Sequence, residues 1–191
     1  YHLADCYIKQ GDKKFARSSF FAASKLDFDK VIQEDAAFNY AKLSYELEYD
    51  PYDQTILAFK NYLNRFPDSP RRQEVYGFLV NHYLTAKDYD AAIKSLEEAG
   101  PLNEKLKLAY QQITYFRAVD FYNNNLLDSS LQYYTKSQSI KVDKKLYALA
   151  HYWKGESFYK KKQYELAIHN YKRFMESPGA FDLAEYNESN Y

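Results

Sequence analysis

The residues best suited to catalysis or metal binding are few and widely separated. Four histidines stand at positions 2, 82, 151 and 169, and the single cysteine is Cys6. No pair of the form His-x-x-x-His or Glu-x-x-His would place two metal ligands on one helix face. Glycine-rich phosphate loops and Gly-x-Ser-x-Gly turns are also absent from the sequence. The sequence therefore predicts no catalytic residue, no metal site, no cofactor and no enzymatic activity.

These side chains have a simpler interpretation as packing residues. His82 precedes the aromatic Tyr83, and His151 follows Ala150, so both are expected to be partly buried on helices. Cys6 adjoins Tyr7, and we expect its thiol to be buried and inert, because free cysteine usually behaves as a small apolar residue.

Composition narrows the class of protein. Lys+Arg and Asp+Glu both number 26 in 191 residues, and this zero net charge argues against a nucleic-acid or anionic-membrane surface. Only 5 Gly and 5 Pro disfavour an all-β sandwich or barrel, which needs many tight turns. The 22 tyrosines and 13 phenylalanines suit a thin structure in which many rings are only partly buried.

No long uncharged apolar run is present, so the sequence predicts neither a signal peptide nor direct membrane insertion. The chain begins in a helix-like segment at Tyr1 and stops in another near Ala184. We therefore expect it to be a fragment of a longer protein.

A repeat of 37 to 38 residues runs along the chain. A small residue followed three positions later by an aromatic one recurs with the aromatic residues at 7, 83, 121 and 158. A weaker unit, with Lys42 in place of the small residue, adds the aromatic residue at 45. A second series of small residues follows each of them, and a large residue stands four positions later: Ala16 and Phe20, Thr55 and Phe59, Ala92 and Leu96, Ser130 and Tyr134, Ala167 and Tyr171. Because residues four apart share a helix face, each unit is expected to form two interlocked helices.

Polar turns separate the two helices of each unit, as at Gln10-Gly11-Asp12 and Lys161-Lys162-Gln163. This pattern resembles the tetratricopeptide repeat (TPR), most closely through Leu79-Val80-x-x-Tyr83 followed by Ala92-Ile93-x-x-Leu96. The resemblance implies an all-α fold, a right-handed superhelical solenoid of antiparallel helix hairpins. The predicted solenoid comprises about five repeats, at 1–32, 33–69, 70–101, 102–142 and 143–179, with the start of a sixth at 180–191.

A narrower resemblance concerns the long second and fifth units. The strings Phe59-x-x-Tyr62-Leu63-x-x-Phe66-Pro67 and Tyr171-Lys172-Arg173-Phe174-Met175-x-x-Pro178 are similar to those of bacterial envelope proteins of the outer-membrane-assembly lipoprotein and Tol-Pal accessory type. This resemblance implies a periplasmic or outer-membrane-associated location and a role in envelope assembly.

In a solenoid of this type, the first helices of successive units line the concave face. Projection at 3.6 residues per turn places on that face the residues that we predict to bind a partner: Asn39, Asn81, Tyr115, Tyr122, Tyr152, Glu156 and Tyr159. Tyrosine rings would anchor a protein or peptide there, with Asn81 or Glu156 bonding its backbone. The alternative is that the tyrosines pack against neighbouring helices.

Two functions fit this sequence. The first is a protein-interaction scaffold that binds a peptide or a partner helix in the concave groove. The second is a structural or assembly subunit that oligomerises through its convex face and the ends of the array. Nucleic-acid binding would need a basic concave face, and the mixed residues of the predicted groove argue against it.

Overall fold

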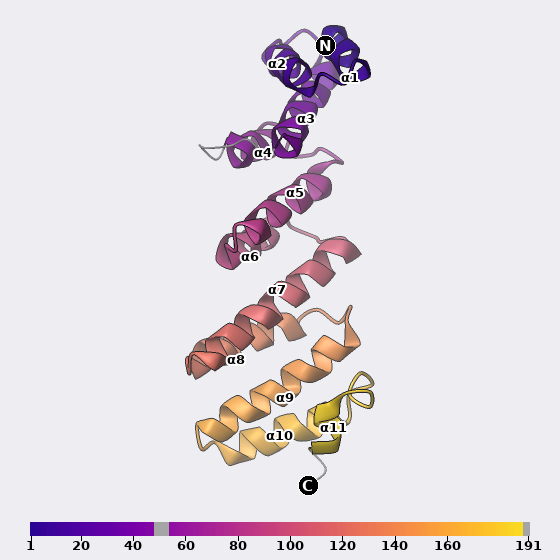
Figure 1. Ribbon diagram of the computed structural model, residues 1–191. Coiled ribbons are helices and arrows are strands. Elements are labelled where there is room, and N and C mark those ends of the chain that lie inside the picture. Colours follow the sequence, from indigo (N-terminus) through magenta and orange to yellow (C-terminus); the bar gives the residue numbers. More distant parts are fainter. Residues whose placement is uncertain (48–53, 189–191) are drawn as a thin grey trace. The chain divides into compact units, whose positions relative to one another are not determined.

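The computed structural model describes residues 1–47 and 54–188 of the chain, and within these ranges it contains helices and no strand (Figure 1). The eleven described helices are α1 His2–Lys9, α2 Lys13–Ser24, α3 Lys30–Glu46, α4 Gln54–Arg65, α5 Arg72–Thr85, α6 Tyr89–Glu98, α7 Glu104–Asn123, α8 Leu127–Gln138, α9 Lys144–Lys160, α10 Tyr164–Met175 and α11 Ala184–Glu188.

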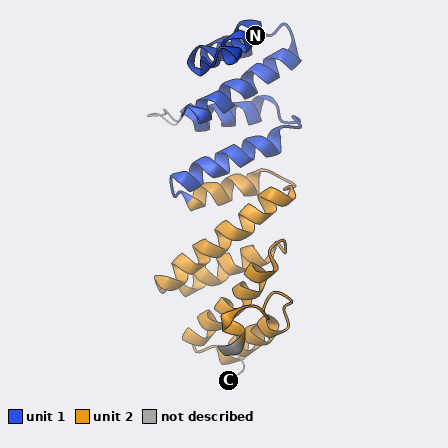
Figure 2. Ribbon diagram, turned by 45° about the vertical axis from the view of Figure 1, so that its right-hand side comes forward, with its two compact units in different colours: residues 1–88 blue, residues 89–191 orange. Residues whose placement is uncertain are grey.

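The helices form two compact units, residues 1–88 and residues 89–191 (Figure 2). In unit 1, helix α2 packs on α1 and α3, and α4 packs on α3 and α5. In unit 2, α7 packs on α6 and α8, and α9 packs on α8 and α10. Each helix thus packs chiefly on its neighbours in sequence, and the predicted all-α array of helical hairpins is confirmed in each unit. The repeat boundaries and the superhelical sense stay predictions.

Acidic and amide side chains mark where several helices begin. The Asp29 side chain accepts hydrogen bonds from the Val31 and Ile32 amides at 2.9 and 3.1 Å. Asp143 does the same for the amides of Lys145 and Leu146, at 2.9 and 3.0 Å. Such caps stabilise a helix by about 1 kcal/mol, because the first amides of a helix have no partner within it.

The turn within a hairpin has one recurring backbone geometry. After the first helix, one residue adopts positive φ, and the next amide donates back to the carbonyl of the repeating aromatic residue. In the first hairpin Gly11 has φ 81°, and the Asp12 amide lies 2.9 Å from the Tyr7 carbonyl oxygen. The same pair of features occurs at Lys87 and Tyr83, Asn125 and Phe121, and Lys162 and Phe158. This is the Schellman helix ending, and the corresponding positions of the second repeat lie outside the described residues.

The small and large positions of the repeat interlock as predicted. Ala4, Ala16, Ala92 and Ala118 are fully buried, as are Phe59 and Tyr134. One very close approach is at Gly155 of α9, where an added Cβ would lie 2.6 Å from the Tyr171 ring of α10. Lys42, which occupies the small position of the second repeat, is half-buried. The repeat pattern therefore reports real close crossings between helices.

Candidate functional site

Two of the predicted partner-binding tyrosines belong to the core of unit 2. Tyr115 is 6% exposed and Tyr122 is 8% exposed. The Tyr115 ring packs 5.7 Å from that of Tyr134, and the Tyr122 ring packs edge-on to Trp153 with centroids 5.1 Å apart. Burial raises the pKa of Tyr115. Much of each ring is therefore covered by neighbouring helices.

The remaining predicted residues of unit 2 have mixed exposure. Tyr152 is half-buried, and its ring contacts Trp153 and Phe174. The Glu156 carboxylate accepts a 2.5 Å hydrogen bond from the Tyr171 hydroxyl. Tyr159 is 59% exposed. Of this set, Tyr159 offers the largest accessible ring.

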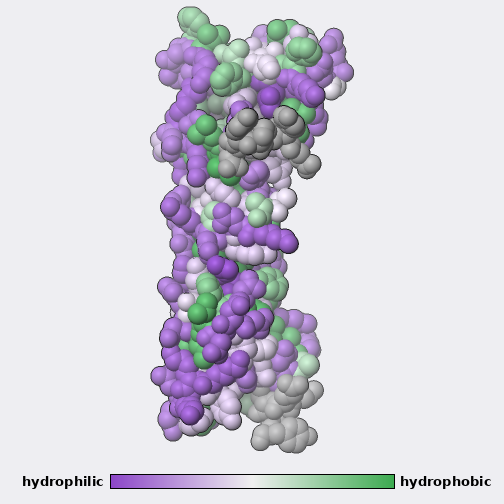
Figure 3. Space-filling view, turned by 60° about the vertical axis from the view of Figure 1, so that its left-hand side comes forward, coloured by the Kyte–Doolittle hydropathy of each residue, from purple (hydrophilic) through white to green (hydrophobic). Residues whose placement is uncertain are grey.

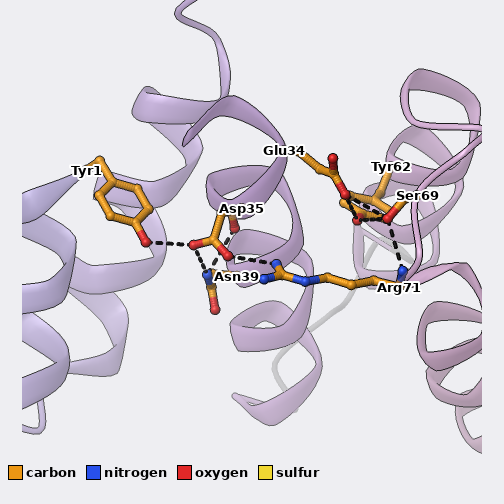
Figure 4. A network of polar contacts seen from close by, with 7 residues as sticks. All are labelled: Tyr1, Glu34, Asp35, Asn39, Tyr62, Ser69 and Arg71. Carbon is orange, nitrogen blue, oxygen red and sulfur yellow. Dashed lines mark hydrogen bonds and ion pairs between the residues drawn. The ribbon is translucent and has the colours of Figure 1, made fainter. Parts of the chain in front are cut away.

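In unit 1, Asn81 is exposed on α5, whereas Asn39 is half-buried on α3 and belongs to a polar network (Figure 4). The network centres on Asp35, one helical turn before Asn39. Asp35 Oδ2 accepts from the Tyr1 hydroxyl at 2.7 Å and from Asn39 Nδ2 at 2.8 Å. Figure 4 shows Tyr1 and Arg71 approaching Asp35 from opposite sides, and Arg71 Nη1 lies 2.7 Å from Asp35 Oδ1. One carboxylate thus links α1, α3 and the start of α5.

The groups around Asp35 are held firmly. The hydrogen bond to Asp35, with burial and the Asp35 charge, raises the pKa of Tyr1 to about 12, so the hydroxyl remains a donor at neutral pH. The Arg71 guanidinium also lies 4.6 Å from the centroid of the Phe38 ring. Such a cation–π contact adds about 0.5–1 kcal/mol at a partly exposed site.

A second polar cluster lies beside the first. Glu34 Oε1 accepts from the Tyr62 hydroxyl at 2.9 Å and from the Ser69 hydroxyl at 2.6 Å. Ser69 Oγ in turn accepts a hydrogen bond from the Arg71 backbone amide at 3.1 Å. Tyr62 is only 1% exposed, and burial is the main cause that raises its pKa to about 12. The cluster ties α3 to α4 and to the connection before α5.

A surface hollow of about 410 Å³ opens over these two networks. Its lining residues are Tyr1, Val31, Ile32, Glu34, Asp35, Pro70 and Arg71. A neighbouring hollow of about 590 Å³ shares Val31 and Glu34 with it and is further lined by Lys25, Asp27, Lys30, Gln33, Arg65 and Phe66. We call the two hollows together the α3 groove.

Apolar side chains are left uncovered in the α3 groove. Val31 is 77% exposed and Ile32 is 38% exposed, in the first turn of α3. Leu26 and Phe28, in the connection before α3, do not line the groove, but they are also exposed, by 56% and 92%. On the face shown in Figure 3, small apolar groups are surrounded by polar side chains, including groups at the N-terminal end of the chain. The groove therefore combines accessible apolar contacts with the charged residues Glu34, Asp35 and Arg71, whose partners are already in place.

Val31 and Ile32 were not among the predicted partner-binding residues. The projection began three residues before the small position of each repeat and ended four residues after it, whereas these two residues lie in the first turn of α3. A detectable signal was present: two β-branched apolar residues stand two and three positions after a capping aspartate, Asp29.

The cysteine and two of the histidines can be compared with their predicted packing roles. No group of three or more His, Cys, Asp or Glu side chains suited to a metal ion occurs among the described residues. Cys6 is exposed, so the expectation of a buried thiol is wrong; it lies on the outer side of α1, away from the buried Ala4. His82 and His151 are half-buried on helices, as predicted.

None of the helices in the described part of the chain has the length and apolar character needed to cross a membrane.

Comparison with known proteins gives a likeness of fold at low identity. No family model matches the chain, and no curated protein matches it. Among solved structures, the crystal structure of MamA is 18% identical over 99% of this chain and 98% of its own, with a TM-score of 0.44. YrrB, described as a TPR protein with an unusual peptide-binding site, is 18% identical over 98% of this chain and 89% of its own, with a TM-score of 0.47.

Proposed function

We propose that this chain is a protein-interaction module that binds an extended peptide across the α3 groove. The observation that carries the proposal is the exposure of Val31 and Ile32 in a hollow whose charged residues are already paired. An apolar side chain of the peptide would cover these two residues.

The pairing within the walls favours binding for a physical reason. A peptide that covered an unpaired carboxylate would leave a buried charge, which is costly. Asp35 already accepts from Tyr1 and Asn39 and pairs with Arg71, while Glu34 accepts from two hydroxyls. Removal of water from Val31 and Ile32 therefore contributes favourable free energy without stranding a charge.

Asn39 has a defined part in this proposal, because it orients the Asp35 carboxylate from the same face of α3. Direct partner contacts by Asn81, Tyr115, Tyr122, Tyr152, Glu156 and Tyr159 stay predictions. The role in envelope assembly and the periplasmic location also stay predictions.

A peptide array tests the proposal. The protein is applied to immobilised random 12-residue peptides, and the peptides it retains are re-measured in solution by fluorescence anisotropy. We expect Val31→Asp/Ile32→Asp to lower the affinity for these peptides at least tenfold. Leu166→Asp is the matched control, because Leu166 is 46% exposed on α10 and lies outside the groove. Circular dichroism melting confirms that both variants fold.

Two results would contradict the proposal. Equal affinity of the groove variant and the wild type would move binding away from the α3 groove. Absence of any retained peptide, together with a stable homo-oligomer in light scattering that Val31→Asp/Ile32→Asp dissociates, would favour the alternative of an assembly subunit.

A further inference from the structure

Unit 2 contains a hollow of different chemistry, with a volume of about 320 Å³. It is formed by the connection between α8 and α9, the first turn of α9, the last turn of α10 and the segment that follows α10. We call it the α9 pocket, and its lining residues are Lys141, Lys144, Tyr147, Arg173, Glu176, Ser177 and Pro178.

The α9 pocket has an excess of positive charge. Three lining residues are cationic and only Glu176 is anionic. Glu176 Oε2 lies 3.4 Å from Arg173 Nη1, and both side chains are more than half exposed, so water weakens this pair. Lys141 and Lys144 form no ion pair with any residue in the described part of the chain. Two positive charges thus remain without an opposite charge in the pocket.

Nearby carboxylates are engaged elsewhere. Asp143 caps α9 through the amides of Lys145 and Leu146. Asp182 lies 3.7 Å from Lys145 Nζ, and Lys145 does not line the pocket. These contacts hold the two acids toward other groups and leave Lys141 and Lys144 to the pocket.

The walls of the pocket are fixed by packing. Tyr147 is half-buried, and its ring meets that of His151 edge-on with centroids 5.1 Å apart. The Ser177 hydroxyl donates to the Arg173 carbonyl at 2.7 Å, and Ser177 is 5% exposed. Gly179 presses so closely on the backbone of Lys144 that an added Cβ would lie 2.2 Å from its carbonyl oxygen. A preformed pocket loses little conformational entropy when a ligand binds.

From this arrangement we infer that the α9 pocket is a second binding site, which takes an acidic side chain of a peptide. Its carboxylate would pair with Lys144 and Arg173, and its aliphatic stem would lie against Tyr147 and Pro178. A single carboxylate or a close pair matches two excess positive charges. A polyanion such as nucleic acid would need a longer basic surface, whereas the chain as a whole has zero net charge.

The test compares two synthetic peptides that differ only in charge, measured by fluorescence anisotropy at low salt. One contains Leu-Glu-Glu-Leu between Gly-Ser ends, and the other contains Leu-Gln-Gln-Leu. We expect the glutamate peptide to bind wild type at least tenfold more tightly, and we expect Lys144→Gln/Arg173→Gln to abolish that preference. The control is Lys94→Gln/Lys105→Gln, which removes two exposed cations outside the pocket and should keep the preference.

Several outcomes would overturn the inference. These are equal binding of the two peptides, a preference that survives in the pocket variant, and an equal loss in the control variant. If a single-stranded thymidine 12-mer binds as tightly as the glutamate peptide, the ligand of the pocket is a nucleic acid rather than an acidic peptide. Peptide binding that is lost in Val31→Asp/Ile32→Asp but retained in Lys144→Gln/Arg173→Gln would support the proposed function alone.

Discussion

The α3 groove of unit 1 and the α9 pocket of unit 2 are built from the same kind of helical hairpin, yet they use charge in opposite ways. In the first, Asp35 receives contacts from three elements of the chain, and its partner Arg71 is ion-paired. In the second, Lys141 and Lys144 form no ion pair within the described residues. Charged side chains therefore join helices in the α3 groove, whereas in the α9 pocket they remain available to a ligand.

The largest expected effect concerns the wall of the α9 pocket. Gly179→Ala would place a Cβ against the backbone of Lys144, which cannot rotate away, and we expect a loss of about 2–3 kcal/mol in the free energy of unfolding. The control is Gly100→Ala, because Gly100 has φ +78° but open space around it, so only backbone strain of about 1 kcal/mol is expected. Urea unfolding measures both variants. Similar losses in the two would show that close packing does not hold this wall.

The next prediction tests the joining role of charge in unit 1. Asp35→Asn removes the ion pair with Arg71 and weakens the bond from Tyr1, and we expect a loss of about 1–2 kcal/mol. Asp182→Asn in unit 2 removes an exposed pair with Lys145 and should change stability by less than about 0.5 kcal/mol. Thermal and urea unfolding of the two variants decide the point. Equal effects would remove the distinction between the two regions.

Acid should weaken the region of the α9 pocket through His151. Burial, and to a lesser degree the nearby charges of Lys154 and Arg173, lower the pKa of His151 to about 4 in the folded protein. Its Nε2 atom is buried without a hydrogen-bond partner among the described residues. Because the unfolded chain has a pKa near 6.5, it binds more protons between pH 4 and 6.5, so stability falls as the pH is lowered through this window. Since His151 is only half-buried, we expect the free energy of unfolding to fall by about 1 kcal/mol across this window.

Urea unfolding at pH 7.5, 5.5 and 4.5 measures this effect. His151→Phe removes the titrating group, so the stability of the variant should depend less steeply on pH than that of the wild type. A pH dependence of the same slope in both proteins would assign the acid sensitivity to other groups.

The smallest effect concerns the hairpin turns. The first hairpin turn has Gly11 at its positive-φ position, whereas the later described turns have Lys87 in unit 1 and Asn125 and Lys162 in unit 2. Lys162→Gly should relieve backbone strain and stabilise the protein by about 0.5–1 kcal/mol, and Gly11→Lys should destabilise it by a similar amount. Differential scanning calorimetry compares the melting temperatures. A lower melting temperature for Lys162→Gly would mean that the lysine side chain contributes more than the strain costs.

Local sequence features predicted the fold well, and non-local contacts explain what they missed. The small position at Gly155 and the large position at Tyr171 came from spacing alone, because close helix crossings restrict residue size. Helical projection placed Tyr122 on an inner face, but it could not show that Trp153 of another helix packs against its ring. In the Asp35 network, Tyr1 lies 34 positions before Asp35 and Arg71 lies 36 positions after it. No periodic pattern in the sequence predicts contacts over such separations.

The crossing of α9 and α10 also constrains how this repeat can evolve. The smallest residue, Gly155, faces one of the largest, Tyr171. At the equivalent positions of the other repeats the sequence has Ala118 with Tyr134, Ala4 with Phe20, and Val80 with the smaller Leu96, while Lys42 departs from the series. Side-chain volume is thus exchanged between two positions 16 residues apart. Homologues that carry a larger residue at 155 should carry a smaller one at 171, so the two sites are expected to mutate as a pair.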